Sequence, residues 1–448
     1  MSARGQFSSR IGFIIAAAGS AVGLGNIWGF PTQVAGNGGA AFVMIYLLLT
    51  FLLAYPILMA ELIIGRHAQS NMVDALDTIS TNPINKIIGR ITGYSGLTVV
   101  ALILSFYAIV AGWMVAYCLE AVAKILDMNA LSQWLTNQSV PRDLAFCLTF
   151  SMLTITIVCK GVAGGIEKWS TRLMPLLLGL IILLIIYVSM QTGASEGWEA
   201  YLVPDFSRIA DPSLLISALG QAFFSLSLGV GTMLIYGSYI SKKENIVVLG
   251  ASVALVDIGI AIMAGMLIIP AMYVALHNGV TIFDANGALI EGPTLIFTVI
   301  PSLFESMGTI GNFVALTFFI LMTIAAVTSS ISMLEVPVAY TVENTNLGRY
   351  KAAWLIGVII MACSTFIILN FGTLFGLVIT ITTQYGQPIV GFLLCLFAGW
   401  VWRRNEILKE IQQGNEHVGE SFFWKVWPNY VKFVCPIILI AMFAQTIM

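Results

Sequence analysis

The chain has 448 residues, of which 58% are hydrophobic and 9% charged, and its formal net charge is −2. This composition excludes a soluble globular protein, and a nearly neutral chain without a basic tract gives no support for nucleic-acid binding. Long apolar runs recur along the whole chain, and about 20 apolar residues are enough to cross the hydrocarbon core of a bilayer. Only helices and closed barrels satisfy their backbone in lipid, and the runs are too long for barrel strands. We therefore expect an all-α polytopic membrane protein with a single membrane domain over residues 1–448.

The apolar runs predict eleven transmembrane helices. In chain order they cover residues 11–33, 39–64, 89–123, 142–159, 166–190, 213–239, 244–273, 308–342, 351–369, 374–402 and 421–447. The third run is long enough for a helix that is tilted or that extends beyond the bilayer.

Lysine and arginine are distributed unequally between the predicted loops. With the N-terminus inside, seventeen of them lie on the inner side, and only Lys124, Arg142 and Arg208 lie on the outer side. The positive-inside rule then predicts a cytoplasmic N-terminus in the plasma membrane of the cell. After eleven spans, the C-terminus is expected outside.

The first and sixth spans contain residues that a continuous helix disfavours. The first carries GSAVGLGNIWGFP over Gly19–Pro31, and the sixth carries FFSLSLGVGT over Phe223–Thr232. Glycine alone could serve close helix packing. However, Asn26, Ser225 and Ser227 add polar side chains in mid-membrane, which favours a functional site. We expect both helices to be unwound there.

Unwinding a helix frees backbone groups for binding. Free carbonyls suit a hard cation such as Na⁺, and free N–H groups at the N-terminus of a half-helix suit a carboxylate. Five spans separate the starts of the two broken helices, so the second break would fall on an inverted copy of the first. The predicted repeats are 11–190 (helices 1–5) and 213–402 (helices 6–10), with 421–447 as helix 11.

Four separated segments resemble the signature segments of the neurotransmitter:sodium symporter family. They are GSAVGLGNIWGFP, GNGGAAF, QAFFSLSLGVGT and AAVTSSISMLEVP, and they occur in the family's order. The resemblance covers nearly the whole chain and is to bacterial sodium-coupled amino acid transporters of the leucine-transporter type. It implies a 5+5 inverted repeat and two Na⁺ ions as the only cofactors, with no organic cofactor.

The resemblance implies a first sodium site at the two breaks. Its ligands would be the substrate carboxylate and residues Ala21, Asn26, Ser225 and Asp257. Asp257 stands where the family has an amide, and no other charge is near it in the sequence. A carboxylate in a membrane span requires a cation or a proton, so sodium ligation is the stronger interpretation and a protonated, packed carboxyl the weaker one.

Asp257 also bears on chloride. Animal members of the family place Cl⁻ beside this sodium, whereas many bacterial members supply a fixed carboxylate. Tyr46, Gln221 and Ser225 match the positions of the anion site, and Ala261 stands where some bacterial members carry a glutamate. We expect Asp257 to supply the negative charge, so that transport needs no chloride.

A second sodium site is implied between the first and eighth spans. Its ligands would be Gly19, Val22, Ala325, Thr328 and Ser329. The alternative is that the hydroxyls of TSSIS only bond to their own helix, as serine and threonine often do.

The resemblance also places the substrate. The expected contacts lie on the first, third, sixth and eighth spans: Ser20, Ala21, Leu24, Gly25, Ile103, Tyr107, Phe224, Ser225, Ser227, Val230, Ser329 and Met333. Monoamine-carrying members have an aspartate at the position of Gly23, so the glycine favours a substrate with its own carboxylate. No charged residue lines the expected wall, which favours a neutral, apolar or aromatic amino acid.

The outer gate departs from the family pattern. Members usually carry an arginine after the GNxW segment and an aspartate on the tenth span, and the two form a charged gate above the substrate. Here these positions are Gly29 and Ile379. Both charges are lost together, which avoids a stranded charge. The sequence does not decide whether packing, for example by Tyr107, Phe224 and Gln33, closes this side.

The inner gate is expected to be intact. Arg4 would pair with Glu343 at the end of the eighth span, with Tyr239 beneath, and Phe7 replaces a tryptophan often found there.

We therefore expect Na⁺-coupled uptake of a neutral L-amino acid by alternating access, in a monomer or weak homodimer, with no enzymatic activity. Two alternatives stay open: a proton-coupled transporter of the same architecture, and a substrate-binding sensor without transport. Besides the substrate, the lipid bilayer is the only partner expected, and nucleic acid is not.

Overall fold

The computed structural model describes residues 5–204, 211–283, 289–290 and 295–447. Every regular element among them is helical, which confirms the all-α fold class. The first half contains α1 (Arg10–Ala21), η1 (Gly25–Gly29), α2 (Phe30–Gly36), α3 (Ala40–Leu49), η2 (Thr50–Ala54), α4 (Tyr55–Ala68), α5 (Met72–Thr78), α6 (Pro83–Ile125), α7 (Asn129–Thr136), α8 (Val140–Val158), η3 (Val162–Glu167), α9 (Lys168–Ser189) and α10 (Ala194–Leu202).

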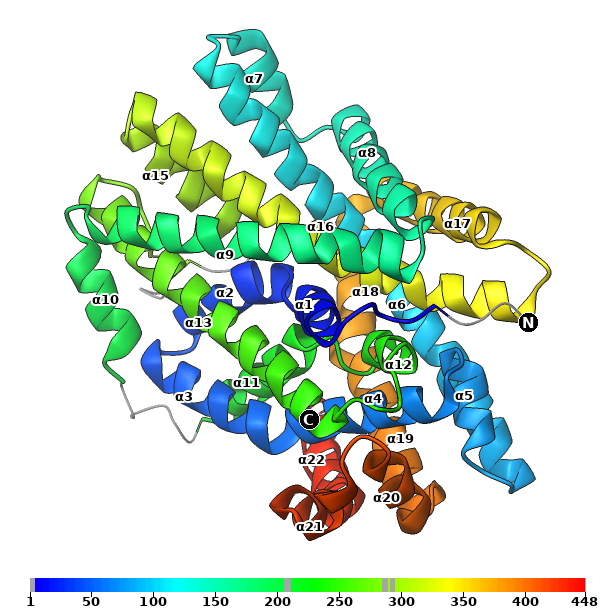
Figure 1. Cartoon of the computed structure of the whole chain (residues 1–448). Helices are drawn as coiled ribbons and strands as arrows, with labels where there is room; N and C mark the ends of the chain where they lie inside the picture. Colours follow the sequence, from blue (N-terminus) through cyan, green and yellow to red (C-terminus); the bar gives the residue numbers. More distant parts are fainter. Residues whose placement is uncertain (1–4, 205–210, 284–288, 291–294, 448) are drawn as a thin grey trace.

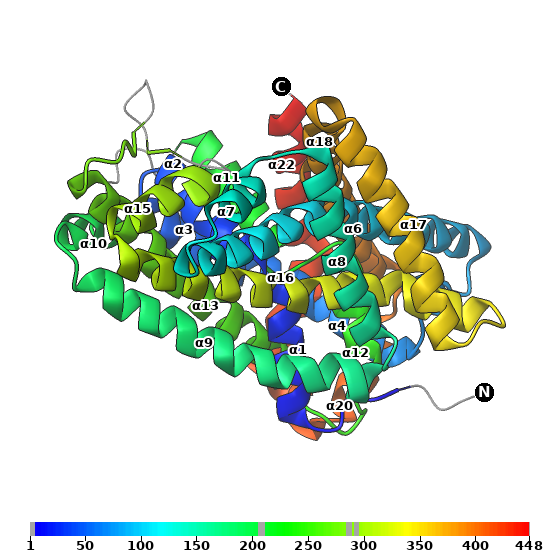
Figure 2. The same cartoon turned by 90° about the horizontal axis from the view of Figure 1, so that it is seen from above.

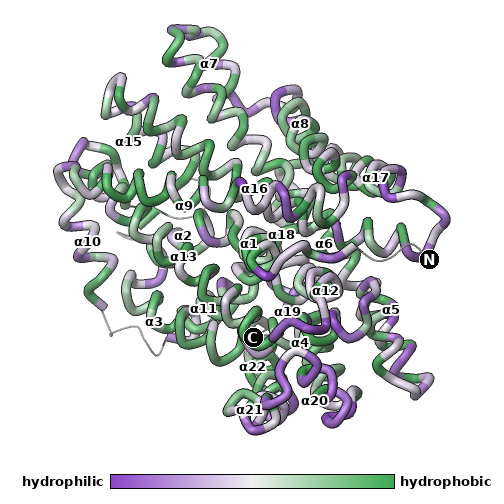
Figure 3. Tube along the Cα trace, in the orientation of Figure 1, coloured by the Kyte–Doolittle hydropathy of each residue, from purple (hydrophilic) through white to green (hydrophobic). Residues whose placement is uncertain are grey.

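The second half is divided more finely. It contains α11 (Pro212–Ser225), α12 (Thr232–Ser238), α13 (Ile246–His277), η5 (Leu295–Val299), α15 (Ile300–Ser306), α16 (Thr309–Asn344), α17 (Arg349–Leu369), α18 (Phe371–Ile379), η6 (Thr380–Gly386), α19 (Gln387–Leu396), η7 (Phe397–Val401), α20 (Arg404–Gln412), η8 (Glu416–Glu420), α21 (Phe422–Asn429), η9 (Tyr430–Val434) and α22 (Cys435–Ile447). Apolar residues dominate the long helices, and polar residues concentrate in α20 and the connecting loops (Figure 3).

Within the described residues, eight helices are long and apolar enough to cross a membrane, and one bent pair makes a ninth candidate. The bent pair is the predicted first span. The predicted sixth span is the pair α11 and α12, each too short to cross by itself, and the eleventh is divided among α21, η9 and α22. The third span is longer than predicted: α6 has 43 residues, about 65 Å at 1.5 Å per residue, so it extends beyond a bilayer core.

Both predicted breaks are present. The α-helix of the first span ends at Ala21, and the chain bends by 52° before it continues at Gly25. In the second break, Ser227, Gly229 and Gly231 have φ values of 51°, 72° and 76°. A side chain at Gly229 would overlap the carbonyl of Gln387, so both the backbone conformation and the close approach require glycine there.

The broken helices lie inside the bundle. In Figure 1, α1 is at the middle of the molecule, and it contacts α9, α13 and α16. Figure 2 shows the long α9 and α16 running side by side, and α16 packs most extensively on α6. Long continuous helices therefore surround the two breaks and hold them in place.

Candidate functional site

The first predicted sodium cluster forms around Asp257 of α13. Asn26, Ser225 and Asp257 are all fully buried. Asn26 Nδ2 donates to Asp257 Oδ1 at 2.7 Å, and Ser225 Oγ donates to Asp257 Oδ2 at 2.7 Å. The Tyr46 hydroxyl donates to Ser225 Oγ at 3.3 Å. The structure thus brings together a carboxylate, an amide and two hydroxyls from four helices, a set of oxygen-rich groups that suits a hard cation.

The other positions that the sequence analysis connected with chloride binding also lie near Asp257. Gln221 Nε2 donates to the Gly25 carbonyl at 2.7 Å, which connects α11 to the break in the first span. Ala261 is fully buried one turn beyond Asp257. Asp257 is therefore the carboxylate that this cluster contains.

The second predicted cluster joins α16 to the first break. Ser329 Oγ donates to the carbonyls of Ser20 at 3.1 Å and Val22 at 3.2 Å. Thr328 Oγ1 donates to the Ala325 carbonyl at 3.1 Å, and a Cβ built on Gly19 would lie 3.4 Å from Thr328 Cβ. All five predicted positions are thus close together. The Thr328 bond is the helix-internal contact named as the alternative, but Ser329 bonds across to the break.

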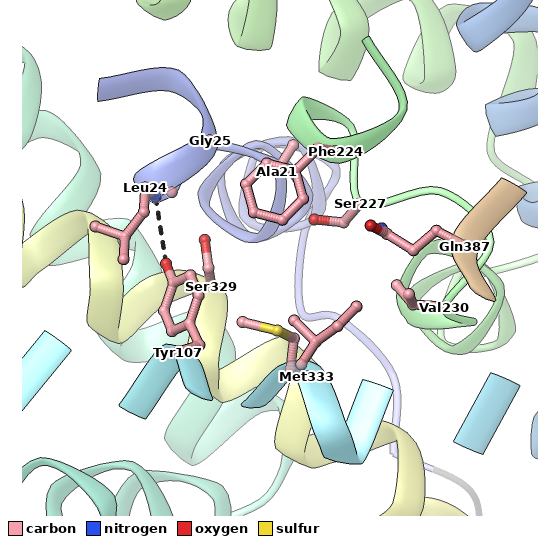
Figure 4. A pocket seen from close by; sticks show the side chains of 12 residues that line it. Ala21, Leu24, Gly25, Tyr107, Phe224, Ser227, Val230, Ser329, Met333 and Gln387 are labelled. Atoms are coloured by element: carbon pink, nitrogen blue, oxygen red, sulfur yellow. Dashed lines mark hydrogen bonds between the residues drawn. The ribbon is translucent and has the colours of Figure 1, made fainter. Parts of the chain in front are cut away.

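A small cavity is lined by residues of both breaks and of α6 and α16 (Figure 4). It has a volume of about 20 Å³, room for about one water molecule. The Tyr107 hydroxyl accepts a hydrogen bond from the Leu24 amide at 3.3 Å. The other lining residues are Ala21, Gly23, Gly25, Ile103, Phe224, Ser227, Val230, Ser329, Met333 and Gln387. Of the predicted substrate contacts, only Ser20 and Ser225 are outside this wall; Ser20 bonds Ser332, and Ser225 belongs to the Asp257 cluster.

Two residues near the pocket were missed by the sequence reasoning. Gln387 lines the pocket and donates to the Leu228 carbonyl at 3.2 Å. Glu61 of α4 is fully buried and accepts from the Gly229 amide at 2.7 Å. Both satisfy backbone groups that the second break leaves without helical partners. A glutamate inside an apolar span was the available signal for Glu61.

A larger cavity, which we call the vestibule, lies beyond the breaks and has a volume of about 530 Å³. Leu24, Tyr107 and Phe224 line both cavities and so divide them. Gly29 and Ile379, the positions of the family's gate charges, both line the vestibule. A Cβ at Gly29 would lie 3.1 Å from Gln221 Oε1, so glycine leaves room for the Gln221 side chain.

The opposite side of the breaks is closed by the N-terminal segment. Phe7 packs edge-on against Phe13 and Tyr236, with centroid distances of 5.4 and 5.6 Å, and its amide donates to the Tyr239 carbonyl at 3.3 Å. Arg4 lies outside the described residues, so its predicted pairing with Glu343 stays a prediction. Glu343 accepts from the Asn71 amide at 2.7 Å.

Tyr239 takes part in a network that the sequence reasoning missed. Its hydroxyl donates to Glu335 Oε1 at 2.6 Å, and Arg349 Nη1 donates to the same oxygen at 3.1 Å. Glu335 is fully buried, so this ion pair ties α12, α16 and the start of α17 together.

The comparison with known families agrees with this geometry. A model described as the sodium:neurotransmitter symporter family matches residues 4–140 and 127–448. The chain belongs to this family. It is therefore a sodium-dependent membrane transporter and not an enzyme.

Individual relatives of this symporter differ in their sequence identity to this chain and in the share of it that they cover. An uncharacterized sodium-dependent transporter, YhdH of Bacillus subtilis, is 36% identical over 99% of this chain and 97% of its own length. The crystal structure of MhsT in complex with L-phenylalanine is 36% identical, has a TM-score of 0.83, and covers 98% of this chain and 99% of its own. The human sodium- and chloride-dependent taurine transporter is 27% identical over 74% of this chain and 59% of its own length.

Proposed function

We propose that the chain imports a neutral L-amino acid with an apolar or aromatic side chain, together with two Na⁺ ions and without chloride. The observation that carries this proposal is the buried carboxylate of Asp257 between the two helix breaks, hydrogen-bonded to Asn26 and Ser225. A fixed negative charge beside the substrate pocket provides what a cation needs in a low-dielectric site.

The first Na⁺ would be held by Asp257, Asn26, Ser225 and the Ala21 carbonyl, and the substrate carboxylate would complete the site. Ala21 lines the pocket, whereas Asn26 and Ser225 lie behind it, so one ion could contact both protein and substrate. Binding of the ion and of the amino acid would then support each other, which is the physical basis of coupling.

The second Na⁺ would be held between α16 and the first break by the carbonyls of Gly19, Val22 and Ala325 and the hydroxyls of Thr328 and Ser329. Ser329 already bridges to Val22 by a hydrogen bond. An ion there would fix the distance between α1 and α16. Loss of the ion would leave the two helices free to separate.

The wall of the pocket supports the substrate class. Ile103, Val230 and Met333 provide an apolar surface, and among the residues that the structure describes no charged side chain lines the pocket. The substrate carboxylate would take the Tyr107 hydroxyl and the Leu24 and Gly25 amides at the half-helix N-terminus. Since the cavity holds only about one water, a large side chain requires Phe224 and Met333 to change rotamer.

Transport would follow from exchange between a state that is closed on the N-terminal side and a state that is closed on the vestibule side. In the described residues, the N-terminal side is closed by Phe7 and by the Glu335 network, whereas the other side has the vestibule. We place the N-terminus in the cytoplasm and the C-terminus outside the plasma membrane, because seventeen of the twenty lysine and arginine residues fall on that inner side.

Each charge that moves down 100 mV contributes about 2.3 kcal/mol, so two Na⁺ ions can drive strong accumulation.

The testing experiment is uptake into proteoliposomes. Radiolabelled neutral amino acids are offered with an inward Na⁺ gradient, with a K⁺ control at the same pH and with a proton gradient in the absence of Na⁺. We expect accumulation of at least one amino acid with Na⁺ only. Accumulation driven by the proton gradient would instead support Asp257 as a proton carrier, and binding without accumulation would indicate a sensor.

Replacing external chloride by gluconate is expected to leave this uptake unchanged, because Asp257 supplies the fixed charge. Initial uptake rates at constant Na⁺ and constant membrane potential provide the measurement. A several-fold loss of rate in gluconate would contradict chloride independence while leaving sodium coupling intact.

Ser329→Ala is expected to raise the Na⁺ concentration for half-maximal uptake about 10-fold or more, because it removes a hydroxyl ligand of the second site. Ser330→Ala is the matched control: its hydroxyl is equally buried but bonds Val327 and Thr154 on the other side of α16. Equal Na⁺ dependence of the two variants would argue against an ion at Ser329.

A further inference from the structure

Two π-helical turns meet where the tenth span ends and the last span begins. Trp400 lies in η7 and Lys432 in η9. A Cβ built on Gly399 would lie 2.7 Å from Lys432 Cα, so the two turns pack closely, backbone against backbone. η7 leads into α20, which Figure 2 shows at the same end of the molecule as the N-terminal segment and opposite the C-terminus. This corner therefore belongs to the end of the bundle that we assign to the cytoplasm.

Trp400 is fixed at the corner by a carbonyl whose α-helical partner is missing. In an α-helix, the Lys432 carbonyl would accept from the amide four residues later, but that residue is Pro436, which has no N–H. Trp400 Nε1 donates to this carbonyl at 2.8 Å instead. The Trp400 side chain is 58% exposed, so the hydrogen bond holds a large aromatic ring at the surface of the bundle.

The Lys432 ammonium lies over this ring. Its Nζ atom is 4.4 Å from the centre of the Trp400 ring and 5.5 Å from the centre of the Phe433 ring, and the two rings meet edge-on with centres 5.4 Å apart. In the part of the chain that the structure describes, Lys432 forms no ion pair with a carboxylate. The two rings thus hold a cation in place, and its N–H donors are left for an anionic ligand.

The surface around Lys432 changes from charged to apolar along the last span. Lys425, about two helical turns before Lys432, is exposed. In the other direction, Ile437 and Ile440 of α22 are exposed apolar side chains about one and two turns beyond Phe433. A phospholipid has the same order of groups, because its anionic phosphate is followed by apolar acyl chains.

We propose that Trp400, Lys432 and Phe433 form a binding site for one anionic phospholipid of the leaflet on the N-terminal side. The lipid phosphate would bind the Lys432 ammonium, and an acyl chain would lie along Ile437 and Ile440. The site is separate from the proposed substrate and sodium sites, and it does not depend on the proposed transport.

The charge near the site selects the headgroup. Arg403 and Arg404 follow Trp400 closely in the sequence, and both are exposed. Glu406, in the first turn of α20, is the exposed carboxylate nearest to them in the sequence. The excess of positive charge attracts an anionic headgroup, whereas a zwitterionic headgroup would bring a second cation close to Lys432.

Native mass spectrometry of the detergent-solubilised, full-length protein measures this binding. Phosphatidylglycerol and phosphatidylcholine with the same acyl chains are titrated separately, and we expect the first phosphatidylglycerol to bind several-fold more tightly. Lys432→Gln should weaken its binding about 5-fold or more, and Lys432→Arg should keep it. Lys160→Gln is the matched control, because Lys160 is an exposed cation of the same side and has no aromatic ring contact among the described residues.

Two results would overturn the site: equal affinity of the wild-type protein for the two lipids, and unchanged phosphatidylglycerol affinity in Lys432→Gln. Trp400→Leu provides a second variant if Lys432→Gln does not fold, and it should also weaken binding because it removes the ring beneath the ammonium. Soluble glycerol 3-phosphate should not displace phosphatidylglycerol, since it lacks the acyl chains. Displacement by it would show a site for soluble phosphates in place of a lipid site.

Discussion

Replacing Asp257 by asparagine is expected to abolish sodium-dependent uptake in chloride-free medium. The carboxylate is fully buried and accepts hydrogen bonds from Asn26 and Ser225, so the amide keeps the shape of the site but removes its charge. Loss of a charged ligand in such a site costs about 2 kcal/mol or more, which lowers Na⁺ affinity by about 30-fold or more. Uptake measured as a function of Na⁺ concentration in gluconate gives the change in Na⁺ affinity.

Chloride should restore part of the uptake by Asp257→Asn. Tyr46, Gln221 and Ser225 stay in place around the site, and an external anion can replace the missing charge there. Ala261→Ser is the matched control on the same face of α13, because Ala261 lies one turn away and contributes no charge. Unchanged Na⁺ affinity in Asp257→Asn would contradict sodium ligation, and a steep dependence of wild-type uptake on proton concentration would favour proton coupling.

The second large effect on uptake is expected from replacing Glu335, on the N-terminal side of the breaks. Glu335→Gln leaves Arg349 without its carboxylate and weakens the bond from Tyr239. Breaking a buried ion pair costs about 3–5 kcal/mol, much of which falls on the conformation that contains the pair. We expect the population to shift toward the state in which the N-terminal side is open, with uptake reduced at least 10-fold.

Thiol accessibility distinguishes this shift from simple unfolding. A cysteine introduced at Ser238, which is buried at the end of α12 next to Tyr239, should become more reactive from the cytoplasmic side in the Glu335→Gln background. Glu120→Gln is the control: it removes a partner of Lys124, which Glu305 still pairs, at a site far from Tyr239. Unchanged accessibility together with full uptake would show that Glu335 does not hold this side closed.

The breaks and their clusters were predictable because unusual residues mark them. Glycines and polar side chains stand out in apolar spans, and the resemblance to the family placed Asn26 and Asp257 in one predicted sodium site and Ser329 in the other. The structure places them within hydrogen-bonding networks at the two breaks. What they bind stays a proposal, because hydrogen bonds among the ligands describe the site and not its occupant.

Other features were beyond the reach of sequence patterns. Hydropathy missed the start of α6, because the helix begins where the Asn82 side chain accepts from the Ile84 amide and Pro83 occupies the first turn. The hydrogen bond from the Tyr117 hydroxyl to the Phe297 carbonyl joins residues 180 positions apart, and aromatic residues in apolar spans carry no signal of their partners. Glu335 did carry a signal, as a carboxylate in a span, but its partner Arg349 is on the next helix.

The length of α6 has a practical consequence for studies of motion. One uninterrupted helix carries Tyr94, whose hydroxyl lies 2.9 Å from that of Tyr340, and it also carries Tyr107 at the pocket and Tyr117, whose hydroxyl donates to the Phe297 carbonyl. The span from Tyr94 to Tyr117 is about 35 Å at 1.5 Å per residue. A continuous helix of this length provides a fixed internal reference for distance measurements. Spectroscopic labels on its two ends should keep a constant separation through the cycle, so that any change measured from them to the first span reports the movement of that span alone.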